Sequence, residues 1–170
     1  MKLSCIITST VLSVALASVA VIFMWRPLTQ ATITHRVFTV AATNDEWTQT
    51  DITVAPGDIL ITNETGNKIT VDKSNDAVGA NGLGDIASAL YMLKAGRVDS
   101  LEEDIGALYM KIGIGPGTRI GAHGNVQASE SGVVKLRVHD TKYSDNAGNF
   151  TVDIIHIPGS LIPPPQAVKQ

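Results

Sequence analysis

The stretch GVVKLRVHDTKYSDNAGNFTVDII, residues 132–155, contains two strand-like segments joined by a polar connection. Apolar and polar side chains alternate in both segments, and the apolar set comprises Val134, Leu136, Val138, Phe150, Val152 and Ile154. An alternation with a period of two places one face of a strand against a core and the other in water. The stretch therefore predicts two half-buried β-strands that flank a loop.

The same alternation recurs upstream in residues 36–42, 50–63 and 67–72. Within the second of these segments, Pro56-Gly57-Asp58 supplies turn residues between two alternating halves. Several short strands of this kind, each with one apolar face, are typical of two antiparallel sheets packed on each other. The sequence predicts an all-β fold, an antiparallel two-sheet β-sandwich over residues 34–157.

One segment departs from this pattern. In DIASALYMLKAG, residues 85–96, Asp85 is a candidate N-cap and Gly96 a C-terminal stop, with apolar residues at helical spacing between them. Ser100 and Glu103 then have the spacing of a capping box. We expect a short helical insert around residues 85–105, between strands.

The N-terminus is hydrophobic. Residues 3–25 carry no charged side chain, and an apolar stretch of about 20 residues is long enough to span a bilayer as a helix. Thr29 and Ala31 also suit a signal cleavage site. Residues 1–31 are therefore either a cleaved signal peptide, which would leave the chain periplasmic or extracellular, or an outward-facing membrane anchor. Both versions imply an exported protein. At the other end of the chain, we expect residues 158–170 to form a flexible, proline-rich tail.

Composition excludes several classes of function. A net charge of −3 without any run of Lys or Arg argues against a nucleic-acid partner. The single cysteine, Cys5, has no partner for an internal disulfide. A Ser-His-Asp set could be drawn from Ser129, His139 and Asp153, but no serine lies in a nucleophile-elbow motif. We expect a binding protein and not an enzyme, with an exported hydrolase as a distant alternative.

Other polar features have ordinary interpretations. The four histidines, His35, His123, His139 and His156, lack metal-ligand spacing and are read as outward strand or loop residues. The glycine-rich stretch 113–121 is not followed by a helix, so it predicts turns and not a phosphate cradle. Residues 72–76 begin like a calcium loop but lack the rest of an EF-hand, which favours a solvated turn.

The connection between the two strands of the opening stretch holds Asp140, Asp145 and Asn146. Because the chain folds back between two strands, these side chains can converge. Calcium prefers six to eight oxygen ligands from carboxylates, amides and carbonyls, held by a loop that can wrap around the ion. Taken alone, the loop is either such a metal site or an ordinary turn rich in Gly, Asn and Asp.

Five segments in order resemble the calcium-dependent galactose-binding lectins of the bacterial PA-I type (PA-IL-like). They are VAATNDEWTQTDITVAPGDILIT at residues 40–62, GALYMKIG at 106–113, GTRIG at 117–121, ASESGVVKLRVHD at 128–140 and DNAGNFTVDI at 145–154. The resemblance covers about residues 37–157. Its most specific parts are Trp47 with Pro56-Gly57-Asp58, the GALYMKIG strand and the HD…DNAGNF loop.

This resemblance implies a jelly-roll-like sandwich that binds one Ca²⁺ through Asp140, Asp145 and Asn146, with a backbone carbonyl from residues 69–71. It also implies a carbohydrate partner whose hydroxyls complete the calcium shell. The galactose binders carry a His and a Gln before the GALxxKIG strand, whereas residues 85–105 contain neither, so we expect altered sugar recognition. The alternative is an envelope or adhesion domain in which calcium is purely structural, and an oligomer fits either case.

The two versions of the N-terminus predict different mature chains. Mass spectrometry of the protein from its native host should find a chain beginning near Thr32 if the segment is a cleaved signal. Recovery of intact residues 3–25 in the membrane fraction would instead identify an anchor.

Overall fold

The computed structural model describes residues 31–72, 77–84 and 104–163. The chain divides into residues 1–30 and 31–170, and the fold described here belongs to the second unit. The hydrophobic helix expected at the N-terminus lies outside the described residues, as does the expected helical insert except for its last two positions. Among the described residues, no helix is both long and apolar enough to cross a membrane.

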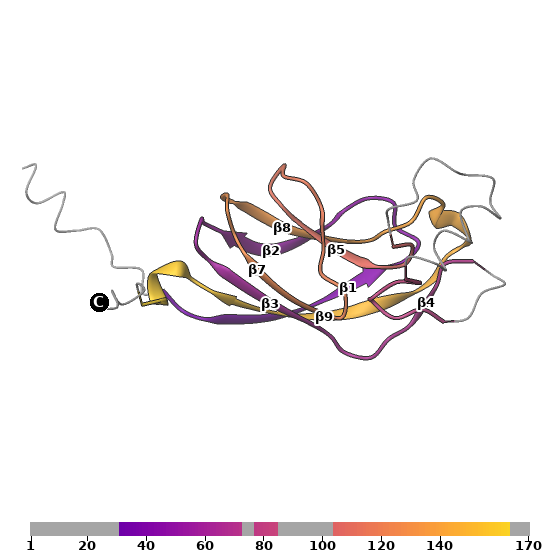
Figure 1. Ribbon diagram of the computed structural model, residues 1–170, viewed down its shortest axis with the longest axis horizontal. Helices are drawn as coiled ribbons and strands as arrows, with labels where there is room; N and C mark the ends of the chain where they lie inside the picture. Colours follow the sequence, from indigo (N-terminus) through magenta and orange to yellow (C-terminus); the bar gives the residue numbers. More distant parts are fainter. Residues whose placement is uncertain (1–30, 73–76, 85–103, 164–170) are drawn as a thin grey trace, which may run out of the picture. The chain divides into compact units, whose positions relative to one another are not determined.

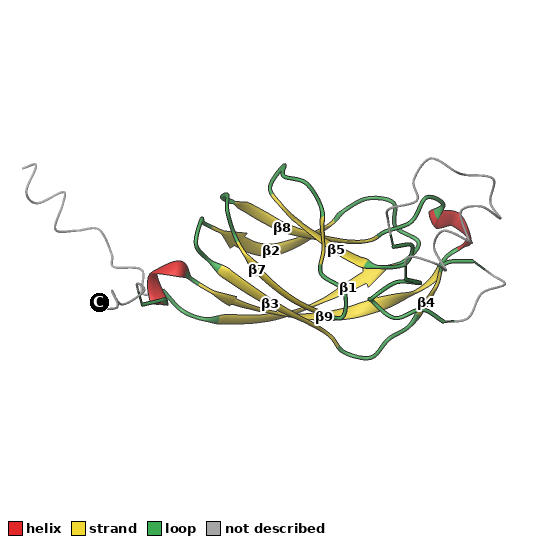
Figure 2. Ribbon diagram, in the orientation of Figure 1, coloured by secondary structure: helices red, strands yellow, loops and turns green. Residues whose placement is uncertain are grey.

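The described residues form nine strands. These are β1 (Thr34–Ala41), β2 (Thr48–Val54), β3 (Ile59–Glu64), β4 (Ile69–Thr70), β5 (Leu108–Ile112), β6 (Thr118–Arg119), β7 (His123–Gln127), β8 (Gly132–Val138) and β9 (Ala147–Ile157). Two single-turn 3₁₀ helices, η1 (Tyr143–Asp145) and η2 (Gly159–Leu161), precede and follow β9. Strands therefore dominate the described part of the chain (Figure 2).

The strands make two antiparallel sheets that pack face to face (Figure 1). Sheet A has the order β1-β9-β3-β7, with β4 paired to the start of β9, and sheet B has the order β2-β8-β5-β6. The first strand pairs with the last, and the second with the last but one, as in a jelly roll. The expected all-β, two-sheet sandwich is confirmed.

The core lies between the sheets and contains the apolar residues that the alternation selected. Val134, Leu136 and Val138 of β8 face Phe150, Val152 and Ile154 of β9 across it, and all six side chains are fully buried. Burying one such side chain stabilises the fold by about 1.5–3 kcal/mol. A one-residue slip of either strand would expose its whole apolar set, so the core fixes the register.

β8 and β9 follow each other in sequence but belong to different sheets. Their connection, residues 139–146, must therefore cross from one sheet to the other at the end of the sandwich. In Figure 1 this crossing and β4 lie together at the right-hand end. The position of the loop follows from the topology.

The opposite end of the sandwich is closed by a polar clamp around Asp58. Its Oδ2 accepts the Ala55 amide at 3.0 Å and contacts His156 Nε2 at 2.8 Å, while Oδ1 accepts the Gly159 amide at 2.8 Å. The expectation that His156 points outward was wrong, because this carboxylate gives the ring a partner inside. Burial alone would raise the pKa of Asp58, but the hydrogen bonds from Ala55, Gly159 and His156 hold it below its usual value.

We predict that Asp58→Ala destabilises the fold by about 2–3 kcal/mol near pH 7, because three donors lose a charged acceptor. Since the folded-state pKa of Asp58 is lowered, its contribution is complete above the unfolded pKa of about 3.9 and is lost as the pH falls through the folded pKa. Urea unfolding at pH 7 and pH 3 measures both effects.

Asp51→Ala is the matched control for this prediction. Asp51 forms an exposed ion pair with Arg36 at 3.3 Å, and such pairs contribute about 0–1 kcal/mol. Equal losses of stability in the two variants would contradict the assignment of the Asp58 clamp.

Candidate functional site

The loop between β8 and β9 is folded around the carboxylate of Asp140. Asp140 Oδ1 accepts the backbone N–H of Thr141 at 2.5 Å and that of Lys142 at 3.1 Å. The N–H of Asp140 in turn donates to the Tyr143 hydroxyl at 3.2 Å. These local bonds reverse the chain immediately after β8 and fix the orientation of the carboxylate.

The other end of the loop is held by Asn146. Its Nδ2 donates to the carbonyl of Ala42 at 2.9 Å, and the N–H of Ala42 donates to the Gly148 carbonyl at 3.0 Å. Only the amide nitrogen can donate to a carbonyl, so this bond fixes the orientation of the amide and directs Oδ1 away from Ala42. The end of β1 thus positions the Asn146 side chain.

A glycine allows a third segment to approach the loop. Gly148 has a φ of +86°, and a Cβ at this position would lie 2.9 Å from the Lys68 carbonyl oxygen. A side chain here would therefore both strain the backbone and collide with residue 68. β4 packs closely as a result, and Thr70 pairs with Ala147, directly beside Asn146. Residues 69–71, expected to supply a carbonyl, lie next to the loop.

Each of the three predicted residues contributes one buried oxygen that no hydrogen bond satisfies within the described residues. These atoms are Asp140 Oδ2, Asp145 Oδ1 and Asn146 Oδ1. Asp140 and Asn146 are only 5% and 6% exposed. Buried acceptors without partners are rare in folded proteins because each costs about 1–3 kcal/mol. The set of two carboxylates and one amide fits a hard cation that prefers oxygen ligands.

The electrostatics of the loop point the same way. Burial raises the pKa of Asp140, and the neighbouring Asp145 carboxylate adds to the rise, against the opposing effects of the Lys142 amide, the Asn146 side chain and the Thr141 amide. Asp145 Oδ2 pairs with Lys142 Nζ at 2.5 Å. A positive charge therefore lies beside the Asp145 carboxylate, whereas no Lys or Arg in the described ranges pairs with Asp140.

An aromatic and cationic cluster flanks the loop on the outer face of sheet B. The Arg137 guanidinium lies 4.7 Å from the Trp47 ring centroid and 5.9 Å from that of Tyr143. Lys111 Nζ lies 4.5 Å from the same Trp47 ring. Stacking of this kind restricts Tyr143, whose hydroxyl receives the Asp140 amide. The cluster supports the loop from the side of β8.

The sequence singled out Asp140, Asp145 and Asn146, each of which has an unpaired buried oxygen, but it did not indicate the residues that orient them. Ala42 acts through its backbone, which no side-chain pattern can indicate, and Lys142 acts through a contact three residues along the loop. Nowhere in the described residues, this loop included, do three His, Cys, Asp or Glu side chains gather at one point, because the third oxygen of the loop belongs to the amide of Asn146. Residues 73–76, the expected solvated turn, lie outside the described ranges.

The Ser-His-Asp set is not brought together. Ser129 precedes β8 and His139 follows it, so the length of the strand separates them. Asp153 lies on the outer face of sheet A, opposite Val37 of β1 and 3.6 Å from His35. The structure therefore offers no support for the hydrolase alternative through these residues.

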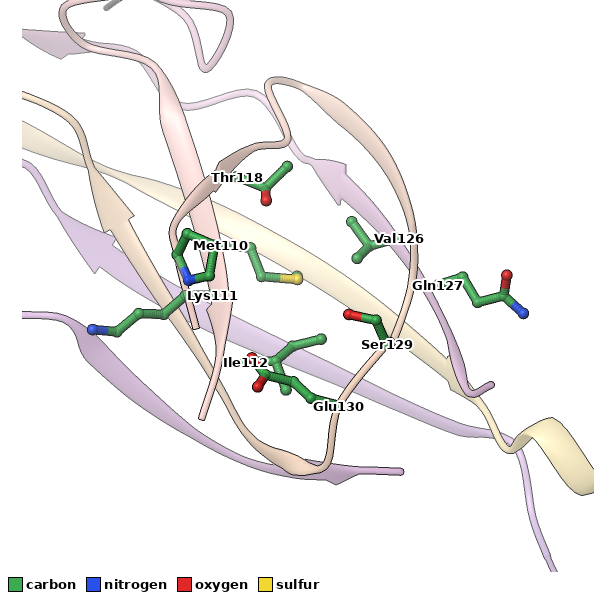
Figure 3. A pocket seen from close by; sticks show the side chains of 9 residues that line it. Met110, Lys111, Ile112, Thr118, Val126, Gln127, Ser129 and Glu130 are labelled. Carbon is green, nitrogen blue, oxygen red and sulfur yellow. The ribbon is translucent and has the colours of Figure 1, made fainter. Parts of the chain in front are cut away.

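A separate cavity of about 150 Å³ opens between residues of β5 in sheet B and of β7 in sheet A (Figure 3). Met110, Ile112 and Val126 give it an apolar floor, and the hydroxyls of Thr118 and Ser129 point into it. Its lining does not include the loop residues, so a small ligand here would bind independently of an ion. None of the residues that line the cavity contributes an unpaired buried oxygen.

Comparisons with known proteins address the fold. No protein-family model matches the chain, and no curated protein matches it. Among solved structures, the N-terminal domain of EclA, described as a PllA-like lectin, is similar with a TM-score of 0.53 and 22% sequence identity. The similarity covers 71% of this chain and 94% of that domain. At this identity the comparison shows a shared lectin-like fold.

We predict that Asp140→Asn raises the melting temperature of the chelator-treated protein by a few degrees at pH 7. The folded-state pKa of Asp140 is raised, so its ionised form costs stability above that pKa, and the cost disappears below the unfolded pKa of about 3.9. Asparagine keeps the Oδ1 acceptor without the buried charge. Differential scanning calorimetry at pH 7 and pH 4 measures the difference.

Asp51→Asn, at an exposed carboxylate, is the control and should not raise the melting temperature. A gain for Asp140→Asn that persists unchanged at pH 4 would show that the buried charge is not its cause.

Proposed function

We propose that Asp140, Asp145 and Asn146 bind one calcium ion and that the chain is a calcium-dependent carbohydrate-binding module of an exported protein. The observation that carries this proposal is the set of three buried oxygens, one from each residue, that accept no hydrogen bond within the described residues. The lectin-like fold supports the carbohydrate part. Export rests on residues 1–31 as a signal or anchor.

The donor chemistry favours calcium over other biological cations. Zinc prefers nitrogen and sulfur ligands in tetrahedral sites, and magnesium demands a near-ideal octahedron. Calcium accepts carboxylate, amide and carbonyl oxygens in irregular numbers from a single loop. The donors here are all oxygens and come from a loop of this kind, with residues 69–71 beside it as a source of a carbonyl.

The protein's own residues prepare the site in three ways. The amides of Thr141 and Lys142 orient Asp140, and the Ala42 carbonyl orients Asn146. Lys142 pairs with Asp145, and a bound divalent cation would replace it in that role and leave its amine able to face a ligand. When bound, calcium would neutralise the two carboxylates and offer open coordination positions to sugar hydroxyls. The role that we propose for this arrangement is binding.

A purely structural calcium is the second candidate. The low exposure of Asp140 and Asn146 favours it, as does the way the loop joins the end of β1 to β4 and β9. An ion here would fasten three segments at one end of the sandwich. In that case the domain would serve adhesion or envelope assembly without direct contact between the ion and a glycan.

We predict that calcium raises the melting temperature of the wild-type protein. At a concentration 100 times the dissociation constant, the gain in stability is about 2.7 kcal/mol. Asp140→Ala and Asn146→Ala should abolish the gain, because each removes one of the unpaired oxygens. Asp153→Ala, on the outer face of sheet A, should retain it. Absence of both a thermal shift and a calorimetric signal at millimolar calcium would remove the metal proposal.

A glycan array probed with and without chelator separates the two functions. We expect glycan binding that calcium supports and that Asp140→Ala abolishes, with galactose weaker than about 100 μM because residues 85–105 contain no His or Gln. Calcium-dependent stability without any glycan signal would favour the structural ion. Glycan binding that chelator leaves intact would place the ligand elsewhere, with the cavity beside Thr118 and Ser129 as the next candidate.

A further inference from the structure

The outer face of sheet A carries most of the exposed large apolar side chains among the described residues. Ile33 is 59% exposed, Val37 55%, Ile61 40% and Ile155 38%. Val37, Ile61 and Ile155 lie on the neighbouring strands β1, β3 and β9, and Ile33 directly precedes β1. Ile59 and Ile157 add two half-buried members. We call these six residues the apolar face.

The strand register places five of the six side chains in three adjacent rows, and Ile33 comes directly before β1. Ile155 of β9 lies opposite His35 of β1 and Ile61 of β3, and Ile157 lies opposite Ile59. Val37 lies opposite Asp153, one row nearer the calcium loop. Ile154, which lies between Asp153 and Ile155 in the sequence, points into the core, so the odd-numbered residues of β9 point outward. Large contiguous apolar patches are uncommon on monomers and mark interaction surfaces.

The outer face of sheet A as a whole is poor in charge. Its outward positions on β1, β9, β3 and β7 contain a single carboxylate, Asp153, and no Lys or Arg. The polar members are His35, Thr39, Asn149, Thr151, Asn63, His123, Asn125 and Gln127. By contrast, Lys111 and Arg137 lie on the outer face of sheet B. Depletion of charge at the centre of a patch is the compositional mark of a protein interface.

The whole outer face of sheet A, with the apolar face within it, has a size that suits a partner with a flat, similar surface. The eight residues of β1 span about 27 Å, and four strands side by side span about 19 Å, which gives roughly 500 Å² in projection. Stable interfaces bury about 800 Å² of accessible surface per partner, which is the same order once the relief of side chains is included.

We propose that the apolar face binds a second copy of this chain, with sheet A packed on sheet A. A face that is apolar at its centre, carries one His–Asp pair and has polar neutral residues around it is complementary to itself. A bilayer surface fits less well, because binding to anionic lipid relies on Lys and Arg, and this face has neither. Packing of two sheets face to face at about 10 Å is the usual way to cover such a surface.

The centre of the apolar face lies well away from the candidate calcium loop along β9. β9 begins beside Asn146 and reaches Ile155 eight residues later, about 27 Å along the strand. Two copies joined through the apolar face would therefore present two loops on one particle. Simultaneous engagement of two sites raises avidity without any new contact. The interface itself does not depend on calcium or on carbohydrate binding.

The proposal is tested by sedimentation of the full-length chain and its variants. All samples are measured in the same buffer, with the same detergent and with chelator present. We expect wild type to sediment as a dimer at micromolar concentration. Ile61→Lys and Ile155→Lys should shift it to monomer, with at least a tenfold weaker association. Ile61→Thr, which keeps a β-branched side chain, should weaken association without loss of the fold, as checked by thermal unfolding.

Ile114→Lys is the matched control, since Ile114 is 99% exposed but lies in the β5–β6 turn, and this variant should remain dimeric. A monomeric wild type would overturn the proposal. It would also be overturned if Ile61→Lys and Ile155→Lys stayed dimeric, as Ile114→Lys is expected to do. A membrane-binding result would also overturn it. In that result the wild type is monomeric without vesicles and floats with phosphatidylcholine vesicles, and Ile61→Lys abolishes the flotation.

Discussion

The structure depends on one crossing of the chain between its two sheets. β8 is an inner strand of sheet B and β9 an inner strand of sheet A, so the eight residues between them must traverse a sandwich about 10 Å thick. Both strands are fixed in register by apolar side chains, which leaves the loop little freedom. The crossing therefore buries Asp140 and Asn146 at the end of the core, and the carbonyl of Ala42 and the amides of Thr141 and Lys142 orient them there.

Two buried carboxylates at opposite ends of the sandwich show how differently such groups can be used. Asp58 receives three donors and its pKa is lowered, so it fastens the turn after β2 to the end of β9. Asp140 has a raised pKa, a like charge nearby and one oxygen without a partner. The first carboxylate is satisfied by the protein itself, whereas the second keeps an unpaired oxygen, which we propose a cation would complete. This contrast is the physical basis for assigning structure to one end and binding to the other.

Much of the fold follows from the sequence, because the period-two alternation of residues such as Leu136 and Val152 is a local signal of burial that the structure confirms. The turn at Gly57 was likewise predictable. The partners of Asp58 and Asn146 were not, since His156 and the Ala42 carbonyl are distant in sequence and reach them only through the sheet topology. The sequence indicated which oxygens lie in the loop, but not that Lys142 pairs with one of them. The apolar face was hidden for a related reason: the sequence alone does not show on which side of the sheet Ile61 and Ile155 lie, and the register places them outside.

The central claim is that the three unpaired oxygens of the crossing loop surround a single calcium ion. A crystal structure of the protein grown with calcium, with anomalous scattering to identify the ion, tests this claim most directly. The account predicts one ion within about 2.3–2.6 Å of a side-chain oxygen from each of Asp140, Asp145 and Asn146, with Lys142 displaced from Asp145. A loop that keeps its Lys142–Asp145 pair at millimolar calcium, with no ion among these oxygens, would contradict it.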